Sequence, residues 1–237
     1  MTEEIFRQDA YARSCEATVT AVNERGGIVL DRTVFYPTGG GQPGDSGTLR
    51  RADGTAIRIA TTVKGEAPDE IVHVPAEGEP LPEAGSTVTA EIDWDRRYAH
   101  MRIHTCLHLL SAVLPYPVTG GQVGDGKGRL DFDMPELTMS KEEIDAALNR
   151  LIDAAHEVAA RWIGDEELAA QPELVKTMSV KPPSGAGRVR LIEVEGCDLQ
   201  PCGGTHVANT HEIGRVTVAK IEKKGRQNRR VQIAFAE

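Results

Sequence analysis

The stretch His104-Thr105-Cys106-Leu107-His108 lies at the centre of residues 96–114, where apolar side chains recur at helical spacing. The members of that apolar stripe are Met101, Leu107, Leu110 and Val113. This spacing predicts a helix over the segment. Because positions i and i+4 project from the same face of a helix, His104 and His108 can hold one metal ion between them.

A second stretch, Cys202-Gly203-Gly204-Thr205-His206, places a thiol and an imidazole four residues apart. Its two adjacent glycines predict a tight loop rather than a regular element. A helix pair and a loop pair together predict a mixed nitrogen and sulfur site for Zn²⁺, formed by His104, His108, Cys202 and His206. The competing interpretation is two unrelated histidine pairs, in solvent or in the core. Four donors fit a closed structural site, and they also fit a catalytic site from which His206 withdraws to act as an acid or base.

Composition and charge narrow the classes of function open to the 237 residues. The sequence has no apolar run long enough to span a bilayer, and its acidic start is unlike a signal peptide, so we expect no membrane partner. Four cysteines in such a chain fit a reducing environment better than a disulfide framework, which predicts a cytoplasmic protein. The formal net charge of −9 argues against a protein that coats nucleic acid generally, and it leaves room for a local basic patch.

Short β-prone runs separated by Gly, Pro and Asp fill residues 1–92. They are residues 17–22, 27–30, 56–60, 71–74 and 88–92. Short strands at regular spacing predict a small barrel, which the alternating last run would close. Residues 77–86 are otherwise typical of a linker, but the strand that follows them moves the expected domain boundary to Asp93. We therefore predict a β-barrel domain at residues 1–92 and a second domain at residues 93–237.

The second predicted domain combines helices with strands. Ser140 and Glu143 form a capping-box pattern ahead of an apolar stripe that continues to Trp162, which predicts one long helix. Strands are expected at residues 129–133, 188–194, 215–221 and 230–235, and a turn-rich loop at the glycine-dense residues 120–128. This mixture predicts an α+β protein whose second domain is an α/β two-layer sandwich carrying the zinc site.

A basic segment lies between the last two predicted strands of this acidic chain. It contains Lys220, Lys223, Lys224, Arg226, Arg229 and Arg230, opposed only by Glu222. The functional interpretation is contact with the phosphates of a nucleic acid. The alternative is a solvated hairpin tip.

Three separated stretches resemble one known family. They are FYPTGGGQPGD at residues 35–45, MRIHTCLHLL at residues 101–110 and PCGGTHV at residues 201–207. In this order they resemble the editing domain of alanyl-tRNA synthetase and its free-standing relatives, the AlaX proteins of medium length. The resemblance places the family's four metal positions on the two histidine–cysteine motifs above. It places the Gly-rich motif of the editing pocket on Gly39, Gly40, Gly41 and Gln42, and a position that recognises the seryl group on Thr33.

The resemblance implies hydrolysis of tRNA(Ala) mischarged with serine, and in some members with glycine, by a zinc-dependent aminoacyl-tRNA deacylase. This chemistry is reasonable, because a pocket for alanine excludes serine only imperfectly, whereas a second site that bonds the seryl hydroxyl can reject alanine. The resemblance also favours contact with tRNA by Lys223, Lys224, Arg226, Arg229 and Arg230. Two alternatives stay open: a non-catalytic tRNA-binding module with structural zinc, and a zinc hydrolase or lyase of a small molecule.

Overall fold

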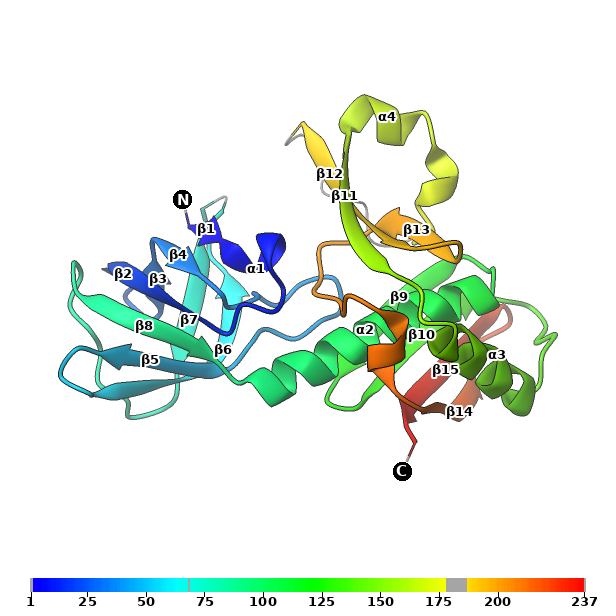
Figure 1. The fold of residues 1–237 in the computed structure, drawn as a ribbon, viewed down its shortest axis with the longest axis horizontal. Coiled ribbons are helices and arrows are strands. Elements are labelled where there is room, and N and C mark those ends of the chain that lie inside the picture. The colour runs from blue at the N-terminus through cyan, green and yellow to red at the C-terminus, as the bar shows by residue number, and fades with distance from the viewer. Residues whose placement is uncertain (1, 68, 178–186, 237) are drawn as a thin grey trace. The chain divides into compact units, whose positions relative to one another are not determined.

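The computed structural model describes residues 2–67, 69–177 and 187–236. The chain forms two compact units, Met1–Tyr98 and Ala99–Glu237, each of which can be followed in Figure 1. The division falls inside helix α2, Trp94–Val113, whereas the sequence placed the boundary at Asp93, the residue before that helix. Within the residues described, no helix combines the length and the apolar character needed to cross a membrane.

The first unit contains a closed six-stranded barrel in the order β2-β3-β7-β6-β5-β8. Its strands are β2 Ser14–Val22, β3 Ile28–Leu30, β5 Gly47–Arg51, β6 Ala56–Lys64, β7 Ile71–Pro75 and β8 Thr87–Ile92. The predicted barrel is confirmed, and each of the five β-prone runs falls within one of these strands apart from a residue at one end. Alternate side chains such as Val19, Ile57 and Ala90 are fully buried and fill the interior.

Strand β5 is the barrel strand that the sequence did not predict. It contains one buried apolar residue, Leu49, between Gly47 and two arginines, so it lacks an apolar alternation. Gly47 is needed there, because a Cβ atom at this position would lie 2.2 Å from the carbonyl oxygen of Glu91 in β8. Three further short elements precede or flank the barrel: β1 Glu3–Glu4, α1 Ile5–Gln8 and β4 Arg32–Thr33.

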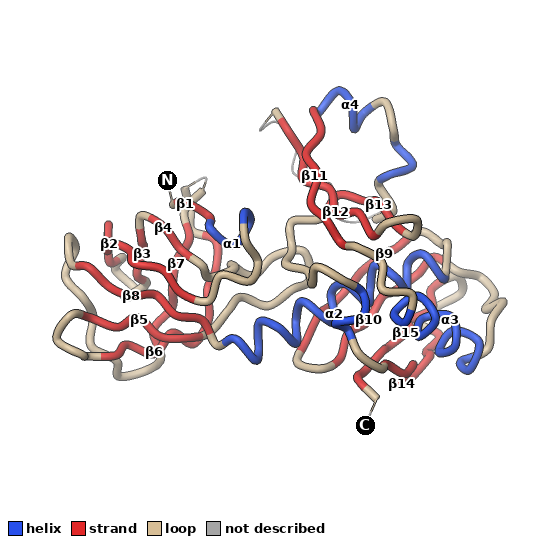
Figure 2. Tube along the Cα trace, viewed as in Figure 1, coloured by secondary structure: helices blue, strands red, loops and turns tan. Residues whose placement is uncertain are grey.

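The second unit is built on a four-stranded sheet with the order β14-β15-β10-β9. The strands are β9 Val118–Gly124, β10 Lys127–Asp133, β14 Val216–Lys223 and β15 Asn228–Phe235. Helix α2 packs on β10, where a Cβ atom at Gly128 would lie 2.5 Å from the Ile103 side chain. Helix α3, Lys141–Asp153, is bonded to β14 through Asn149, whose Nδ2 donates to the Val216 carbonyl at 2.9 Å. Figure 2 shows these helices against the sheet, which confirms the predicted α/β layers.

A second sheet in this unit has the order β11-β12-β13. Its strands are β11 Val158–Gly164, β12 Arg188–Val194 and β13 Asp198–Pro201. The short helices α4 Asp165–Ala169, η1 Pro172–Leu174 and η2 Thr210–Ile213 complete the described elements. In Figure 1, β11, β12 and α4 extend away from the four-stranded sheet.

Two predictions for the second unit are wrong. The long helix expected to reach Trp162 ends at Asp153, and residues from Val158 form strand β11 instead. Ala155 takes a positive φ of 56°, which ends the helix, and pairing with β12 satisfies the following backbone. The loop expected at residues 120–128 is mostly the β9–β10 hairpin, in which Gly128 allows β10 to pack closely against α2.

Candidate metal centre

The four predicted donors of the second unit come together in one group, in which the three histidines are buried and Cys202 is partly buried. His104 and His108 project from α2, and Cys202 and His206 from the loop after β13, with all donor atoms within 4.8 Å of one another. The Cys202 sulfur lies 3.5 Å from His104 Nε2 and 3.2 Å from His206 Nε2. Around a tetrahedral zinc ion, bonds of about 2.0–2.3 Å separate the donors by roughly 3.3–3.8 Å. The donor set and its spacing therefore fit a tetrahedral ion of borderline softness.

Strand β12 holds the loop that carries Cys202. Arg190 Nη1 donates to the carbonyl oxygens of Cys202 and Gly204 at 3.0 and 2.9 Å, and its own carbonyl accepts from the Cys202 amide at 3.1 Å. The Gly204 amide in turn donates to the Cys202 sulfur at 3.4 Å. These bonds fix the loop without a ligand, which is the preorganisation that a metal site needs.

Asp198 at the start of β13 orients His108. His108 Nδ1 donates to the Asp198 carboxylate at 2.8 Å, and that carboxylate also accepts from Gln200 at 2.8 Å and pairs with Lys176. Burial is the largest single influence on His108 and would lower its pKa, but the interactions with Asp198 and Cys202 together outweigh it and raise the pKa to about 9. Burial would raise the pKa of Asp198, yet His108 and Lys176 hold it at about 2. With the proton assigned to Nδ1, His108 Nε2 is left to face the donor group.

Thr105 orients His206 in the same manner. The Thr105 hydroxyl donates to the Met101 carbonyl at 2.9 Å, so its oxygen accepts from His206 Nδ1 at 3.2 Å and from the Val207 amide at 3.2 Å. Burial, reinforced by His104, lowers the pKa of His206 to about 3. With its proton assigned to Nδ1, His206 turns Nε2 toward the Cys202 sulfur, an orientation that suits a metal ligand.

The two cysteines near the centre differ in their chemistry. Burial raises the pKa of Cys106 to about 12, because no neighbouring charge compensates for it. Burial also acts on Cys202, but the surrounding imidazoles outweigh it and bring the pKa well below its usual value. Cys202 is therefore the cysteine suited to act as a thiolate donor, and Cys106 lies outside the group of potential donors.

The Gly-rich motif, residues 39–42, lies in the first unit and folds as a tight turn. The Gly39 and Gln42 backbones exchange two hydrogen bonds of 3.1 and 3.0 Å, while Gly40 and Gly41 take φ angles of 58° and 81° that other residues rarely adopt. The Tyr36 hydroxyl donates to the Gly39 carbonyl at 2.8 Å. The Gln42 side chain is buried.

Thr33 is fully buried in the same unit, where its hydroxyl already has partners. It lies 2.8 Å from His73 Nε2 and accepts from the Phe35 amide at 3.0 Å. Because His73 Nδ1 donates to the Ile28 carbonyl at 3.0 Å, Nε2 is an acceptor, and the Thr33 hydroxyl is its donor. The Phe35 amide uses one of the two lone pairs of the Thr33 oxygen.

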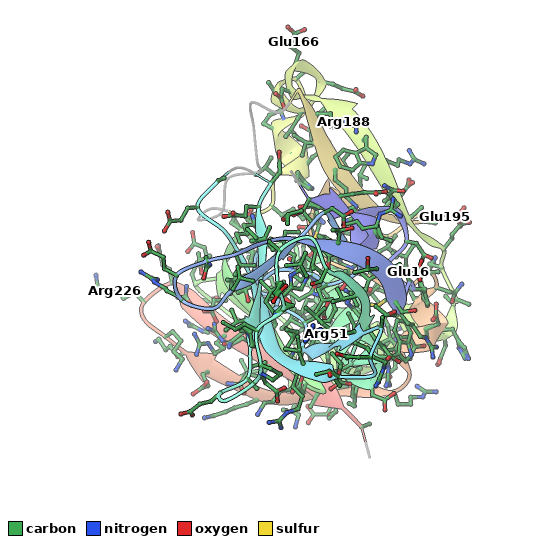
Figure 3. The ribbon with its side chains drawn as sticks, turned by 90° about the vertical axis from the view of Figure 1, so that its left-hand side faces the viewer. Glu16, Arg51, Glu166, Arg188, Glu195 and Arg226 are labelled. Atoms are coloured by element: carbon green, nitrogen blue, oxygen red, sulfur yellow. The ribbon has the colours of Figure 1, made fainter. Side chains whose placement is uncertain are left out.

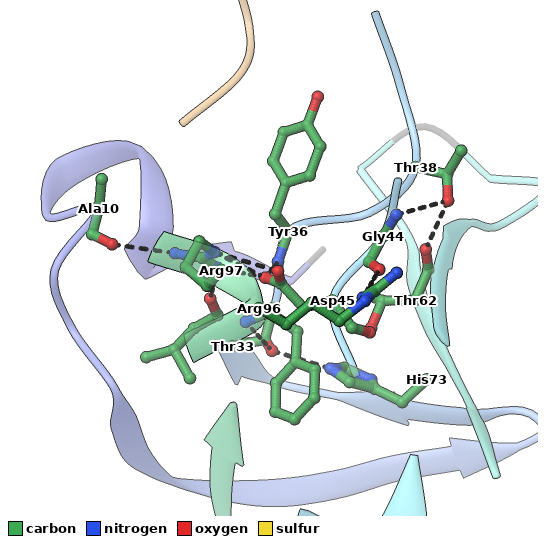
Figure 4. Close-up of polar contacts among 12 residues, drawn as sticks. Ala10, Thr33, Tyr36, Thr38, Gly44, Asp45, Thr62, His73, Arg96 and Arg97 are labelled. Carbon is green, nitrogen blue, oxygen red and sulfur yellow. Dashed lines mark hydrogen bonds and ion pairs between the residues drawn. The ribbon is translucent and has the colours of Figure 1, made fainter. Parts of the chain in front are cut away.

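A buried ion pair that the sequence analysis missed anchors the segment around the Gly-rich motif (Figure 4). Arg97 and Asp45 are both buried, and Arg97 Nε lies 2.9 Å from the Asp45 carboxylate, which also accepts from the Tyr36 amide at 2.6 Å. Arg97 donates further to the Val34 and Ala10 carbonyls at 2.6 and 3.0 Å. The only sequence signal was a charged residue at the end of the resembling stretch, Asp45, with no indication of its partner.

The basic segment forms the β14–β15 hairpin, and the structure divides its members. Arg230 makes two bonds to Asp131, of 2.7 and 2.9 Å, and Arg229 donates to the Pro135 carbonyl at 2.6 Å. Lys224 lies 3.5 Å from Glu222. Lys223 and Arg226 are exposed near the tip of the hairpin, where Figure 3 labels Arg226.

Comparison with known proteins finds relatives that match the chain over almost its whole length. The alanyl-tRNA editing protein AlaX-M of Methanosarcina acetivorans is 36% identical over 245 aligned positions that cover 100% of both chains. AlaX-M of Pyrococcus horikoshii is 34% identical, covering 98% of this chain and 97% of that protein. The chain belongs to the alanyl-tRNA editing protein family. The resemblance drawn from the three sequence stretches is thereby confirmed.

The editing family is also connected to whole synthetases. The alanine–tRNA ligase of Sulfurisphaera tokodaii is 37% identical over 94% of this chain, which covers 25% of that ligase. A family model described as tRNA synthetases class II (A) matches residues 6–96, and one described as the threonyl and alanyl tRNA synthetase second additional domain matches residues 189–232. The second match contains the Cys202 loop and most of the basic hairpin.

We predict that Cys106→Ser keeps a full equivalent of bound metal and nearly unchanged activity, because the Cys106 thiol is outside the donor group. Metal analysis of the purified variant measures this directly. Loss of the metal from Cys106→Ser would identify Cys106 as the thiolate donor and overturn the assignment of Cys202.

Proposed function

We propose that this chain hydrolyses the ester bond of tRNA(Ala) mischarged with serine, and with glycine, in a zinc-dependent reaction. The observation that carries the proposal is the buried, preorganised group of three imidazoles and one thiolate in a chain that matches editing proteins over their whole length. Such a reaction takes place on charged tRNA, and all four cysteines are free thiols, so we place the protein in the cytoplasm.

One set of residues would bind the ion, and a second set orients those ligands. His104, His108, Cys202 and His206 would bind zinc, which when bound supplies Lewis acidity toward an ester carbonyl or a water molecule. Asp198 keeps the His108 proton on Nδ1, and Thr105 keeps the His206 proton on Nδ1. His206 would then serve as a ligand through Nε2, with its Nδ1 proton directed to Thr105.

Substrate selection is assigned to the first unit. We propose that Gly39, Gly40, Gly41 and Gln42 border the pocket and that Thr33 accepts a hydrogen bond from the seryl hydroxyl. We propose that Thr33 accepts in this hydrogen bond because its own hydroxyl proton is donated to His73 Nε2. Alanine would leave the Thr33 oxygen without this bond in a dry site, which disfavours the correctly charged tRNA.

The closed donor group also favours one alternative. Four protein ligands are the usual number of a structural zinc site, which suits a tRNA-binding module without catalysis. Hydrolysis rates of Ser-, Gly- and Ala-tRNA(Ala), measured side by side, separate the two functions. The editing proposal predicts release of serine and glycine with alanine retained. Tight binding of all three without release would support the binding module and contradict the proposal.

We propose that the basic hairpin contacts tRNA phosphates, through Lys223 and Arg226 in particular, with Lys224, Arg229 and Arg230 adding positive potential. Replacing both Lys223 and Arg226 by Gln should raise KM several-fold and reduce the salt slope of binding by about two, because each lost phosphate contact removes roughly one released counterion. The single-turnover rate at saturation should change little, since neither residue belongs to the donor group.

The matched control for this variant replaces Lys141 and Arg150, two exposed basic residues of α3, by Gln. It removes the same charge from the same unit. An equal change in the salt slope for both double variants would show a general charge effect and would remove the hairpin from the tRNA contact surface.

A further inference from the structure

Trp162 of strand β11 is an exposed aromatic side chain that the metal centre does not explain. Among the described residues, it is one of three large apolar side chains that are exposed, with 46% of its surface accessible. The guanidinium carbon of Arg188 lies 4.8 Å from the centre of the indole ring, a cation–π contact. Figure 3 labels Arg188 on the arm formed by β11 and β12.

The register of the small sheet places this pair on the face that serves the metal centre. Trp162 is directly opposite Arg190, and Arg188 lies two residues along the same strand, so all three side chains share one face. Gln200 and Asp198 are opposite Ile192 and Val194 and therefore lie on that face as well.

The hydrogen bonds of Asp198 and Arg190 connect this face of the sheet to the metal centre. Asp198 bonds the ligand His108, and Arg190 bonds the carbonyls of the loop that carries Cys202. Trp162 comes next, because cross-strand neighbours have their Cβ atoms roughly 5 Å apart. The exposed ring thus lies directly opposite the arginine that holds the metal loop, and the Arg188 guanidinium lies two residues further along the strand.

We propose that Trp162 and Arg188 form a stacking platform for an unpaired nucleobase next to the ester at the 3′ end of the substrate RNA. Aromatic rings and arginine planes are the groups on which single-stranded bases stack, and they accept any base. The Arg188 guanidinium adds positive charge for the adjoining phosphate. The assignment rests on the proposed function, since a tRNA ester is attached to an unpaired 3′ end.

The test compares two uncharged RNA minihelices with the same stem, one carrying four unpaired 3′ nucleotides and one blunt. Trp162→Leu keeps apolar bulk and removes the ring, so affinity for the overhang RNA should fall roughly 5- to 100-fold, the effect of losing one stacked base. Affinity for the blunt RNA should not change. Trp162→Phe should retain most of the overhang preference.

Arg161 supplies a matched control. It is the exposed neighbour of Trp162 on the opposite face of β11, where it pairs with Glu193. Arg161→Ala removes the same charge as Arg188→Ala, and only Arg188→Ala should reduce the overhang preference. An equal loss in both, or an undiminished overhang preference in Trp162→Leu, would overturn the platform. A variant that merely misfolds would lose both RNAs together and its metal, and Trp162→Phe would then decide.

Two further outcomes are distinct. Because the minihelices are uncharged, a Trp162-dependent overhang preference without hydrolysis of Ser-tRNA(Ala) would support the platform and contradict the proposed function. A change from dimer to monomer in Trp162→Leu during sedimentation, with RNA binding intact, would identify this face as a contact between copies and contradict the platform.

Discussion

The double variant Cys202→Ala, His104→Ala is expected to bind no zinc and to hydrolyse Ser-tRNA(Ala) no faster than the uncatalysed reaction. It removes one donor from the loop and one from helix α2, so that neither motif keeps its pair. The two remaining imidazoles cannot complete a tetrahedral site. Metal analysis and a deacylation assay on the same preparation measure both effects.

The barrel should survive this substitution, because its interior is built from its own apolar side chains, such as Val19, Leu49 and Ile57. Circular dichroism of the barrel strands and the unchanged metal content of Cys106→Ser are the controls. Stoichiometric zinc in the double variant would show that the ion binds elsewhere and that the four-donor assignment is wrong.

Thr33→Val is expected to slow hydrolysis of Ser-tRNA(Ala) by roughly fivefold to a hundredfold and to leave hydrolysis of Gly-tRNA(Ala) nearly unchanged. A lost hydrogen bond in a dry pocket is worth about 1–3 kcal/mol, and glycine has no hydroxyl to lose. Gln42→Ala should act in the same direction if its amide contacts the seryl group. Single-turnover kinetics on both substrates measure the ratio of the Ser-tRNA(Ala) rate to the Gly-tRNA(Ala) rate, which should fall in each variant.

Thr33→Ser is the matched control for this prediction. It keeps a hydroxyl that can still donate to His73 and accept from the Phe35 amide. It should therefore keep the preference for serine, whereas valine also leaves His73 Nε2 and the Phe35 amide unpaired and should lower stability. Equal slowing of both substrates in Thr33→Val would mean that Thr33 supports the barrel and does not recognise serine.

The metal centre could be predicted from sequence because its donors come in two local pairs. His104 and His108 are joined by helical spacing, and Cys202 and His206 by a glycine turn, so each half is visible in a short window. Asp198, which orients His108, and Arg190, which holds the loop, were not predicted. Asp198 acts through a contact with a helix 90 residues away, and Arg190 through contacts with a loop 12 and 14 residues away. Neither residue type is distinctive by itself.

The error in the predicted helix has a similar cause, because the strand that pairs with its last residues is distant in the sequence. The apolar residues from Ile144 to Trp162 continue a helical stripe, but the chain reverses at Ala155, and Val158 begins a strand whose partner, β12, lies beyond residue 187. Local periodicity cannot reveal a partner so distant in the chain.

The buried Arg97–Asp45 pair was missed for the same reason. Asp45 precedes Arg97 by 52 positions, and the two side chains meet only once the barrel has folded around them. Neither residue carries a local pattern that distinguishes it from a solvated charge, so only the folded structure identifies the pair.

Hydrolysis of mischarged tRNA should depend on zinc held by the buried donor group. The most direct measurement titrates the chelated, folded protein with zinc and follows the initial rate of Ser-tRNA(Ala) hydrolysis, with circular dichroism recorded at each point. We expect a negligible rate without metal and a linear rise that saturates at one equivalent, while the dichroism spectrum stays constant. A full rate in the folded, metal-free protein, or no hydrolysis at any zinc occupancy, would contradict this dependence.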